Sequence, residues 1–206
     1  MRIRYNSPVV LTYAVAAVLV LVADQFFDGE VSRNYFAVLP SFDPGSVLSY
    51  FRMISHAIGH QDATHLLANF SLILLIGPIL EEKYGSLALL GMMFVTSLAT
   101  GILNVLFIPT GLMGASGVAF MMILLSSFTN IRAREIPLTF ILVVLIYLAR
   151  EVVTAFSTDS ISQFAHIAGG VFGSSFGFLI GREPMAPAVI QSIDEQPYLP
   201  PGPADS

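Results

Sequence analysis

Six apolar stretches, each close to the length of a membrane-crossing helix, constrain this chain more than any other feature. A helix needs about 20 mostly apolar residues to cross the hydrocarbon core of a bilayer. We predict spans at residues 8–27, 64–80, 87–108, 112–129, 136–156 and 161–180. Only 11% of the residues are charged and the mean hydropathy is +0.77, so the chain lacks the charge that a water-soluble domain needs. We therefore expect an all-α membrane protein whose six transmembrane helices form one bundle.

The rest of the composition excludes several classes of protein. The chain has no cysteine, so disulfides, thiolate catalysis and cysteine-ligated zinc are excluded. The formal net charge is -5 and no basic patch is present, which argues against a nucleic-acid partner. The first apolar stretch is too long for a signal-peptide core, so we interpret it as a retained span. We expect residues 1–181 to form the membrane domain and the proline-rich residues 182–206 to form a flexible cytoplasmic tail.

Basic residues indicate the orientation, because cytoplasmic loops carry more arginine and lysine than outside loops. If the N-terminus is cytoplasmic, the inside segments contain Arg2, Arg4, Lys83, Arg132, Arg134 and Arg182. The outside segments then contain Arg33, Arg52 and Arg150. This bias predicts that both termini are cytoplasmic, in agreement with an even number of spans.

Residues 24–55 then form a long outside loop that is rich in aromatic side chains. Its aromatic residues are Phe26, Phe27, Tyr35, Phe36, Phe42, Tyr50 and Phe51. Because aromatic rings favour the headgroup zone of a bilayer, we expect the loop to lie partly in the interface. An ordinary extracellular loop is the alternative.

All four histidines and one Gly-Ala-Ser-Gly turn fall at the same end of the predicted spans. Ser116 lies near the start of the fourth span and His166 near the start of the sixth, while His65 and Asn69 begin the second. With a rise of ~1.5 Å per residue, these groups share a depth of roughly 5–10 Å below the outer surface. Polar side chains are costly in hydrocarbon, so the shared depth indicates a polar site that opens to the outside.

The turn at Ser116 has features that suit a nucleophile. Gly114 and Gly117 allow the backbone to approach a substrate closely. A serine at a helix start also lies beside unpaired backbone N–H groups, which can stabilise an oxyanion. Small residues also line helix contacts in membranes, so this turn by itself is more typical of a packing position.

His166 supplies the base that a serine nucleophile needs. A histidine in a membrane requires a partner or a water-filled cavity. A stripe of glycines follows it, at Gly169, Gly173, Gly177 and Gly181. Such a stripe lets another helix approach closely, so we expect the sixth span to pack on the fourth and to bring His166 to Ser116. A structural histidine on a packing helix is the alternative.

His65 and Asn69 share a helix face because they are four residues apart, and both can donate hydrogen bonds to an oxyanion. His60 precedes this helix, and we expect it to hold the loop in place. His56 and His60 have the same spacing, and histidine pairs also bind zinc. Asp62 is the one nearby carboxylate and no HExxH pattern occurs, so we favour the absence of a metal.

Three motifs resemble those of the rhomboid family of intramembrane serine proteases, over residues 51–181. The string HAIGHQDATHLLAN, from His56 to Asn69, resembles the second-span motif of the family. The GASG sequence around Ser116 resembles its GxSG nucleophile motif, and AHIAGGVFG around His166 resembles its AHxxGxxxG motif. Each motif is modest alone, but their order and spacing together are highly specific.

The resemblance implies a catalytic dyad with no acidic third member and no cofactor. Ser116 would be the nucleophile, and His166 the general base and then the general acid. His65, Asn69 and the backbone N–H of Ser116 would form the oxyanion hole. The substrates would be transmembrane proteins, cut in or near their membrane-spanning segments.

The chain departs from the family pattern at two aromatic positions. A Trp-Arg pair of the family is replaced by Phe51-Arg52 in the first loop. A tyrosine that often follows the nucleophile by four residues is replaced by Phe120, which keeps the stacking on the base but lacks the hydroxyl. Phe120, with His60, Gly169 and Gly173, is expected to support the site.

We expect the protein to act as a protease in a bacterial inner membrane. Two other functions are alternatives. One is a catalytically inactive rhomboid-like protein that binds membrane clients, although the intact Ser116 and His166 count against it. The other is a transporter or channel for small polar solutes, which requires polar residues across the whole bilayer. The fourth and sixth spans instead become apolar and glycine-rich toward the inside. No transit peptide precedes the first span, which argues against mitochondria and plastids.

Overall fold

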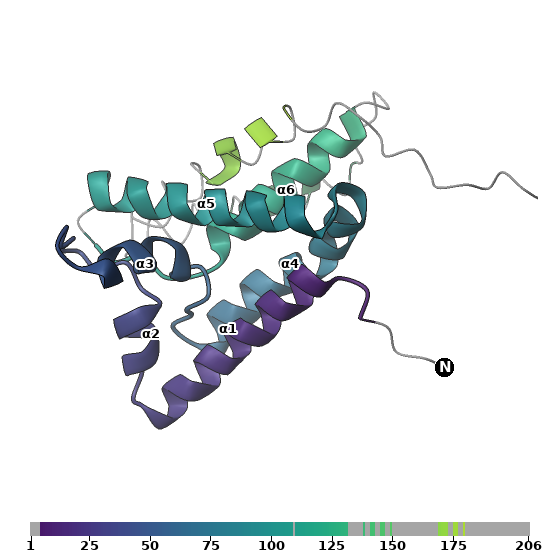
Figure 1. The fold of residues 1–206 in the computed structure, drawn as a ribbon. Helices are drawn as coiled ribbons and strands as arrows, with labels where there is room; N and C mark the ends of the chain where they lie inside the picture. The colour runs from purple at the N-terminus through teal and green to yellow at the C-terminus, as the bar shows by residue number, and fades with distance from the viewer. Residues whose placement is uncertain are drawn as a thin grey trace, which may run out of the picture.

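The structure is a computed structural model that describes residues 5–108 and 110–131, together with positions 138, 141, 142, 145, 146, 149, 169–172, 175, 176 and 179. The chain is mostly helical in this part (Figure 1). The helices are α1 (Pro8–Phe26), α2 (Glu30–Tyr35), α3 (Val47–Ser55), α4 (Ala63–Tyr84), α5 (Ser86–Phe107) and α6 (Ser116–Ile131). Three of them, α1, α4 and α5, are long and apolar enough to cross a membrane.

The first three predicted spans coincide within a few residues with helices that are long and apolar enough to cross a membrane, but the predicted start of the fourth is wrong. Helix α6 begins at Ser116 and not at Leu112. Leu112 instead forms an isolated antiparallel bridge with Val38, in the loop between α1 and α4. The predicted fifth and sixth spans and the tail fall largely outside the described residues, so the count of six spans stays a prediction.

Helix α4 lies at the centre of the bundle and packs against α1, α5 and α6 (Figure 1). Its start is capped by the Asp62 side chain, which accepts a hydrogen bond of 2.7 Å from the His65 N–H. Its end is at Gly85, whose φ of +84° is favourable for glycine and lets α5 begin at once. These two signals fix where α4 presents His65 and Asn69.

A buried carboxylate joins α1 to the far end of α4. The Glu81 side chain accepts hydrogen bonds of 3.0 Å each from the backbone N–H groups of Val9 and Val10, in the first turn of α1. The Ser86 hydroxyl donates a third bond to it at 2.6 Å. A negative group at a helix N-terminus satisfies the unpaired N–H groups and interacts favourably with the helix dipole. Glu81 therefore acts as an N-terminal cap for α1, supplied from another helix.

The loop between α1 and α4 contains two short helices, α2 and α3, which lie together at the end of the bundle where α1 and α5 end (Figure 1). Helix α3 packs on α5, where the backbone of Met53 touches Gly101. Such an approach needs a residue without a side chain, because a Cβ at position 101 would overlap the Met53 carbonyl oxygen. Phe26, Phe27, Tyr35 and Tyr50 are exposed, and their placement in the membrane interface stays a prediction.

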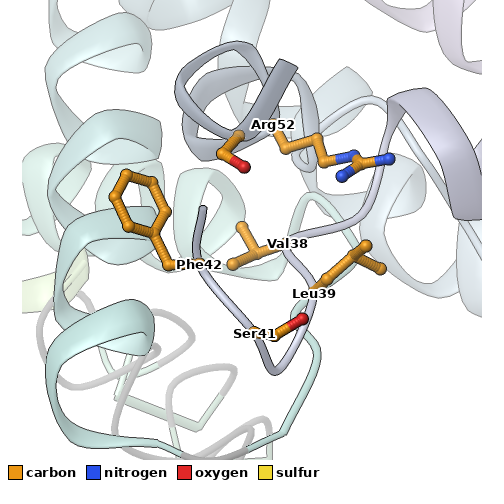
Figure 2. Close-up of a pocket in the computed structure, with 6 residues that line it drawn as sticks. Val38, Leu39, Ser41, Phe42 and Arg52 are labelled. Atoms are coloured by element: carbon orange, nitrogen blue, oxygen red, sulfur yellow. The ribbon is translucent and has the colours of Figure 1, made fainter. Parts of the chain in front are cut away.

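A small, open hollow lies on this loop (Figure 2). It is lined by Val38, Leu39, Ser41, Phe42, Ser49 and Arg52. Arg52 donates a hydrogen bond of 2.8 Å from Nε to the Asn34 carbonyl oxygen, and its guanidinium points away from Phe42 (Figure 2). Arg52 therefore joins α3 to the last turn of α2.

Candidate active site

Ser116 is the first residue of α6, and the backbone immediately before it has a conformation that favours glycine. Gly114 has a φ of +129°, which a residue with a side chain rarely adopts. Ala115 is fully buried, whereas Ser116 itself is only partly buried. We call residues 112–117 the Ser116 turn. Its geometry leaves the serine accessible while the residue before it is held in the interior.

Gly114 brings the Ser116 turn against the start of α4. A Cβ at position 114 would lie 2.7 Å from Cε1 and 2.8 Å from Nε2 of His65, and 3.7 Å from Nδ2 of Asn69. These three residues were expected to form one substrate-binding and oxyanion-binding site. The structure brings them together, and glycine at position 114 is what allows the approach.

Asn69 carries a buried donor at this place. The residue is 3% exposed, and its Nδ2 has no hydrogen-bond partner within the described part of the chain. A buried amide group is costly when it is not hydrogen-bonded. The Asn69 amide lies beside the Ser116 turn and is therefore suited to donate a hydrogen bond to a negatively charged oxygen.

Two consecutive N–H groups of the Ser116 turn donate hydrogen bonds to the loop that precedes α4. The Gly114 N–H donates to the His56 carbonyl oxygen at 2.9 Å. The Ala115 N–H donates to Nε2 of the His60 ring at 3.4 Å. His60 was expected to support its own loop, but its contact is more direct, because it holds the residue next to Ser116.

Both ring nitrogens of His60 and of His56 have partners in the protein. In His60, Nδ1 lies 3.0 Å from the Ile58 carbonyl oxygen, and Nε2 receives the Ala115 N–H. In His56, Nδ1 lies 3.3 Å from the Arg52 carbonyl oxygen, and Nε2 lies 3.3 Å from the Thr100 hydroxyl. A zinc ion needs a free ring nitrogen on each histidine. These hydrogen bonds therefore favour structural roles over metal binding.

Burial keeps these two histidines neutral. Burial lowers the pKa of His56 to about 4, against the opposing effect of the Arg52 and Met53 carbonyl groups. Burial and, to a smaller extent, the neighbouring His65 lower the pKa of His60 to about 4. Both rings are therefore uncharged at neutral pH, and for His60 this agrees with the Ala115 N–H, which needs an acceptor at Nε2.

Two described positions of the sixth predicted span, Gly169 and Gly170, lie against the first half of α6. A Cβ at Gly169 would lie 2.8 Å from the Gly117 carbonyl oxygen. The backbone of Gly170 touches the Phe120 ring. His166 and Gly173 lie outside the described residues, so the pairing of His166 with Ser116 stays a prediction. The close approach at Gly169 agrees with the expected packing of the glycine stripe on the fourth span.

Two contacts of the Ser116 turn were not predicted from the sequence. One is the bridge in which Val38 and Leu112 exchange backbone hydrogen bonds of 2.9 and 3.0 Å. The other is the bond to the His56 carbonyl group. Both use backbone atoms of distant segments, which leave no side-chain pattern in the sequence.

The Rhomboid domain family matches residues 48–183, close to the range 51–181 over which the motifs were found. The chain is also 25% identical over 178 residues to the Rhomboid protease GlpG of Haemophilus influenzae. That alignment covers 84% of this chain and 91% of the relative.

Proposed function

This chain belongs to the rhomboid family, and we propose that it is an intramembrane serine endopeptidase that cuts other membrane proteins in or near their transmembrane segments. The observation that carries the proposal is the contact of Gly114 with His65 and Asn69 directly before Ser116. It joins a candidate nucleophile to two candidate oxyanion donors from another helix. We further propose six spans, cytoplasmic termini, a bacterial inner membrane and a site that opens to the outside.

The first half of the reaction forms an acyl-enzyme. His166 accepts the hydroxyl proton of Ser116 while Oγ bonds to the scissile carbonyl carbon, and the carbonyl π electrons move to the oxygen. The resulting oxyanion accepts hydrogen bonds from Asn69 Nδ2, the His65 ring and the Ser116 backbone N–H. The oxyanion then collapses, the C–N bond breaks, and the leaving amine takes the proton from His166.

The second half uses water. A water molecule gives a proton to His166 and attacks the ester carbonyl, so that a second oxyanion forms in the same site. Its collapse breaks the bond to Ser116, which regains a proton from His166, and releases the new carboxyl end. The partly exposed position of Ser116 supports access for this water.

The substrate must lose helical structure at the cut. A helix holds each carbonyl group in a hydrogen bond to the N–H four residues later, so an intact helix hides its scissile bond. Residues that weaken helices, such as glycine and proline, would favour unwinding at the site. We therefore propose substrates with such residues close to the cleaved bond and, from the family resemblance, a small residue just before it.

The alternative within the family is an inactive protein that binds membrane clients. The hydroxyl-free ring of Phe120 is the observation that favours it, because the family often has a tyrosine there. The experiment is to label the purified, detergent-solubilised protein with a fluorophosphonate probe, and to compare wild type with Ser116→Ala and His166→Ala. An active enzyme is labelled, and both variants lose the label.

Ser126→Ala is the matched control, because Ser126 lies on the same helix and bonds to the Ile123 carbonyl oxygen at 2.9 Å. It should keep full labelling. A wild-type protein that is folded but unlabelled would support the client-binding alternative, and Phe120→Tyr would then be the first substitution to test. Labelling that persists in Ser116→Ala would show that the nucleophile is another residue.

A further inference from the structure

The backbone N–H of Ala115 is a buried donor that has no acceptor within α6. Its side chain is fully buried and its N–H precedes the first turn of α6, so the acceptor must come from another segment. That acceptor is Nε2 of His60, at 3.4 Å. Loss of the acceptor would leave an unpaired N–H in the interior, at a cost of roughly 1–3 kcal/mol. The residue beside Ser116 therefore depends on one imidazole nitrogen.

The partners of the ring define its protonation. A carbonyl oxygen can only accept a hydrogen bond, so Nδ1, which lies 3.0 Å from the Ile58 carbonyl, carries the proton. Nε2 is then a lone-pair acceptor, as the Ala115 N–H needs. A second proton would turn Nε2 into a donor facing another donor, and the bond would be lost.

We infer that His60 is a positioning residue with a regulatory function: its neutral ring holds the Ser116 turn, and protonation by acidification releases the turn. The inference rests on the proposed role of Ser116 as nucleophile. We call the bond between the His60 ring and the Ala115 N–H the latch. It is pH-sensitive, and His60 lies outside the dyad, in the loop before α4.

The surroundings of His60 favour the neutral ring. His65 of α4 lies with its ring centroid 5.1 Å away, and Phe70 of the same helix lies 5.7 Å away. His65 disfavours a positive charge on the His60 ring, while Asp62 at the start of α4 partly favours one. From α1, Tyr13 donates its hydroxyl to the Ala57 carbonyl oxygen at 2.6 Å, and the Ser116 turn has no ionisable side chain.

The other ionisable group on the same loop is His56, whose carbonyl group binds Gly114. Protonation of His56 is the alternative cause of any acid response of the turn, because burial lowers the pKa of His56 as well. A released His60 has an ordinary pKa of 6.5, against about 4 in the latched state. By linkage, the population of the released turn should rise about tenfold between pH 7.5 and pH 5.5.

The test measures the turn and not the protease activity, so its failure is distinct from failure of the proposed function. Amide hydrogen exchange of a peptide covering residues 112–120 is measured by mass spectrometry on the full-length protein in detergent micelles, at pH 7.5 and 5.5. Rates are divided by the intrinsic rate of an unstructured peptide at each pH. We expect exchange of the wild-type turn to increase about tenfold at pH 5.5, with no such change for residues 86–95 of α5.

His60→Gln keeps a carbonyl acceptor but cannot titrate, so its turn should exchange equally at both pH values. His56→Gln is the matched control and should keep the acid response of the wild type. Equal exchange of the wild-type turn at both pH values overturns the inference, as does an acid response that persists in His60→Gln. If His60→Gln does not fold, nitrogen NMR of ring-labelled wild-type protein at pH 7.5 decides: a proton on Nδ1 supports the latch, and a proton on Nε2 overturns it.

Discussion

Val38 and Leu112 exchange both of their backbone hydrogen bonds, with N···O distances of 2.9 and 3.0 Å. Val38 belongs to the loop between α1 and α4, and Leu112 lies four residues before Ser116. The bridge is buried, with Val105 of α5 packed against it. The position of the Ser116 turn is therefore tied to the conformation of a loop more than seventy positions earlier in the chain.

Val38→Pro removes the N–H that donates to the Leu112 carbonyl oxygen. We expect at least a tenfold fall in kcat/KM for cleavage of a transmembrane substrate, because the Ser116 turn loses an anchor. Val38→Ala keeps both backbone bonds and should lose much less activity. Equal losses in the two variants would show that side-chain packing, and not the backbone bridge, is what matters.

Gly114→Ala should abolish most of the activity. The new Cβ would lie 2.7 Å from the His65 ring, on a backbone whose φ of +129° is unfavourable for alanine. Displacement of a catalytic group by about 1 Å can cost about 100-fold in rate, so we expect kcat/KM to fall by that amount or more. Gly91→Ala on α5 is the matched control, because no atom lies within 4 Å of its added Cβ. Retention of activity in Gly114→Ala would contradict the described geometry.

Asn69→Ala tests the oxyanion hole. Loss of one oxyanion donor typically lowers kcat by about 100- to 1,000-fold. Its Nδ2 has no partner in the described residues, so we expect the fall in kcat with little change in KM or in stability. Steady-state kinetics in detergent or liposomes measure this, with Ser71→Ala on the exposed side of α4 as the control. An unchanged kcat in Asn69→Ala would remove Asn69 from the mechanism.

Glu81→Ala should destabilise the fold without altering catalysis. Its carboxylate accepts two N–H bonds from the first turn of α1 and one from Ser86. Loss of hydrogen bonds to a charged group costs roughly 1.5–3 kcal/mol, and the free energy of unfolding should fall by about that amount. Glu82→Ala changes the exposed neighbour and should have little effect on an unfolding titration in mixed micelles. The kcat of the folded fraction of either variant should equal that of wild type.

The buried His56 predicts a loss of stability in acid. Burial lowers its pKa from an ordinary 6.5 to about 4, so the unfolded state binds more protons between these values. The stabilising contribution is complete above pH 6.5 and is lost as the pH falls toward 4. Unfolding titrations across this range should show a shallower pH dependence for His56→Gln than for wild type. Identical slopes would show that His56 is not buried in its neutral form.

The sequence alone determined which residues are candidates for chemistry and which segments are apolar enough to cross a membrane. Transfer of apolar side chains into hydrocarbon is additive along a segment, so α1, α4 and α5 were readable as spans from local hydropathy. Ser116, His65 and Asn69 were identified as candidates for a related reason, because polar groups at membrane depth need a function or a partner.

Only the tertiary structure decided how the Ser116 turn is held. Its anchors are the Val38 bridge, the His56 carbonyl group and the His60 ring, and its approach to α4 depends on the φ of Gly114. The start of α6 was predicted four residues too early because Leu112 is apolar and fits a helix by hydropathy, whereas its backbone is used in pairing. Backbone hydrogen bonds between distant segments depend on chain geometry and not on side-chain type, so no local pattern could have predicted them.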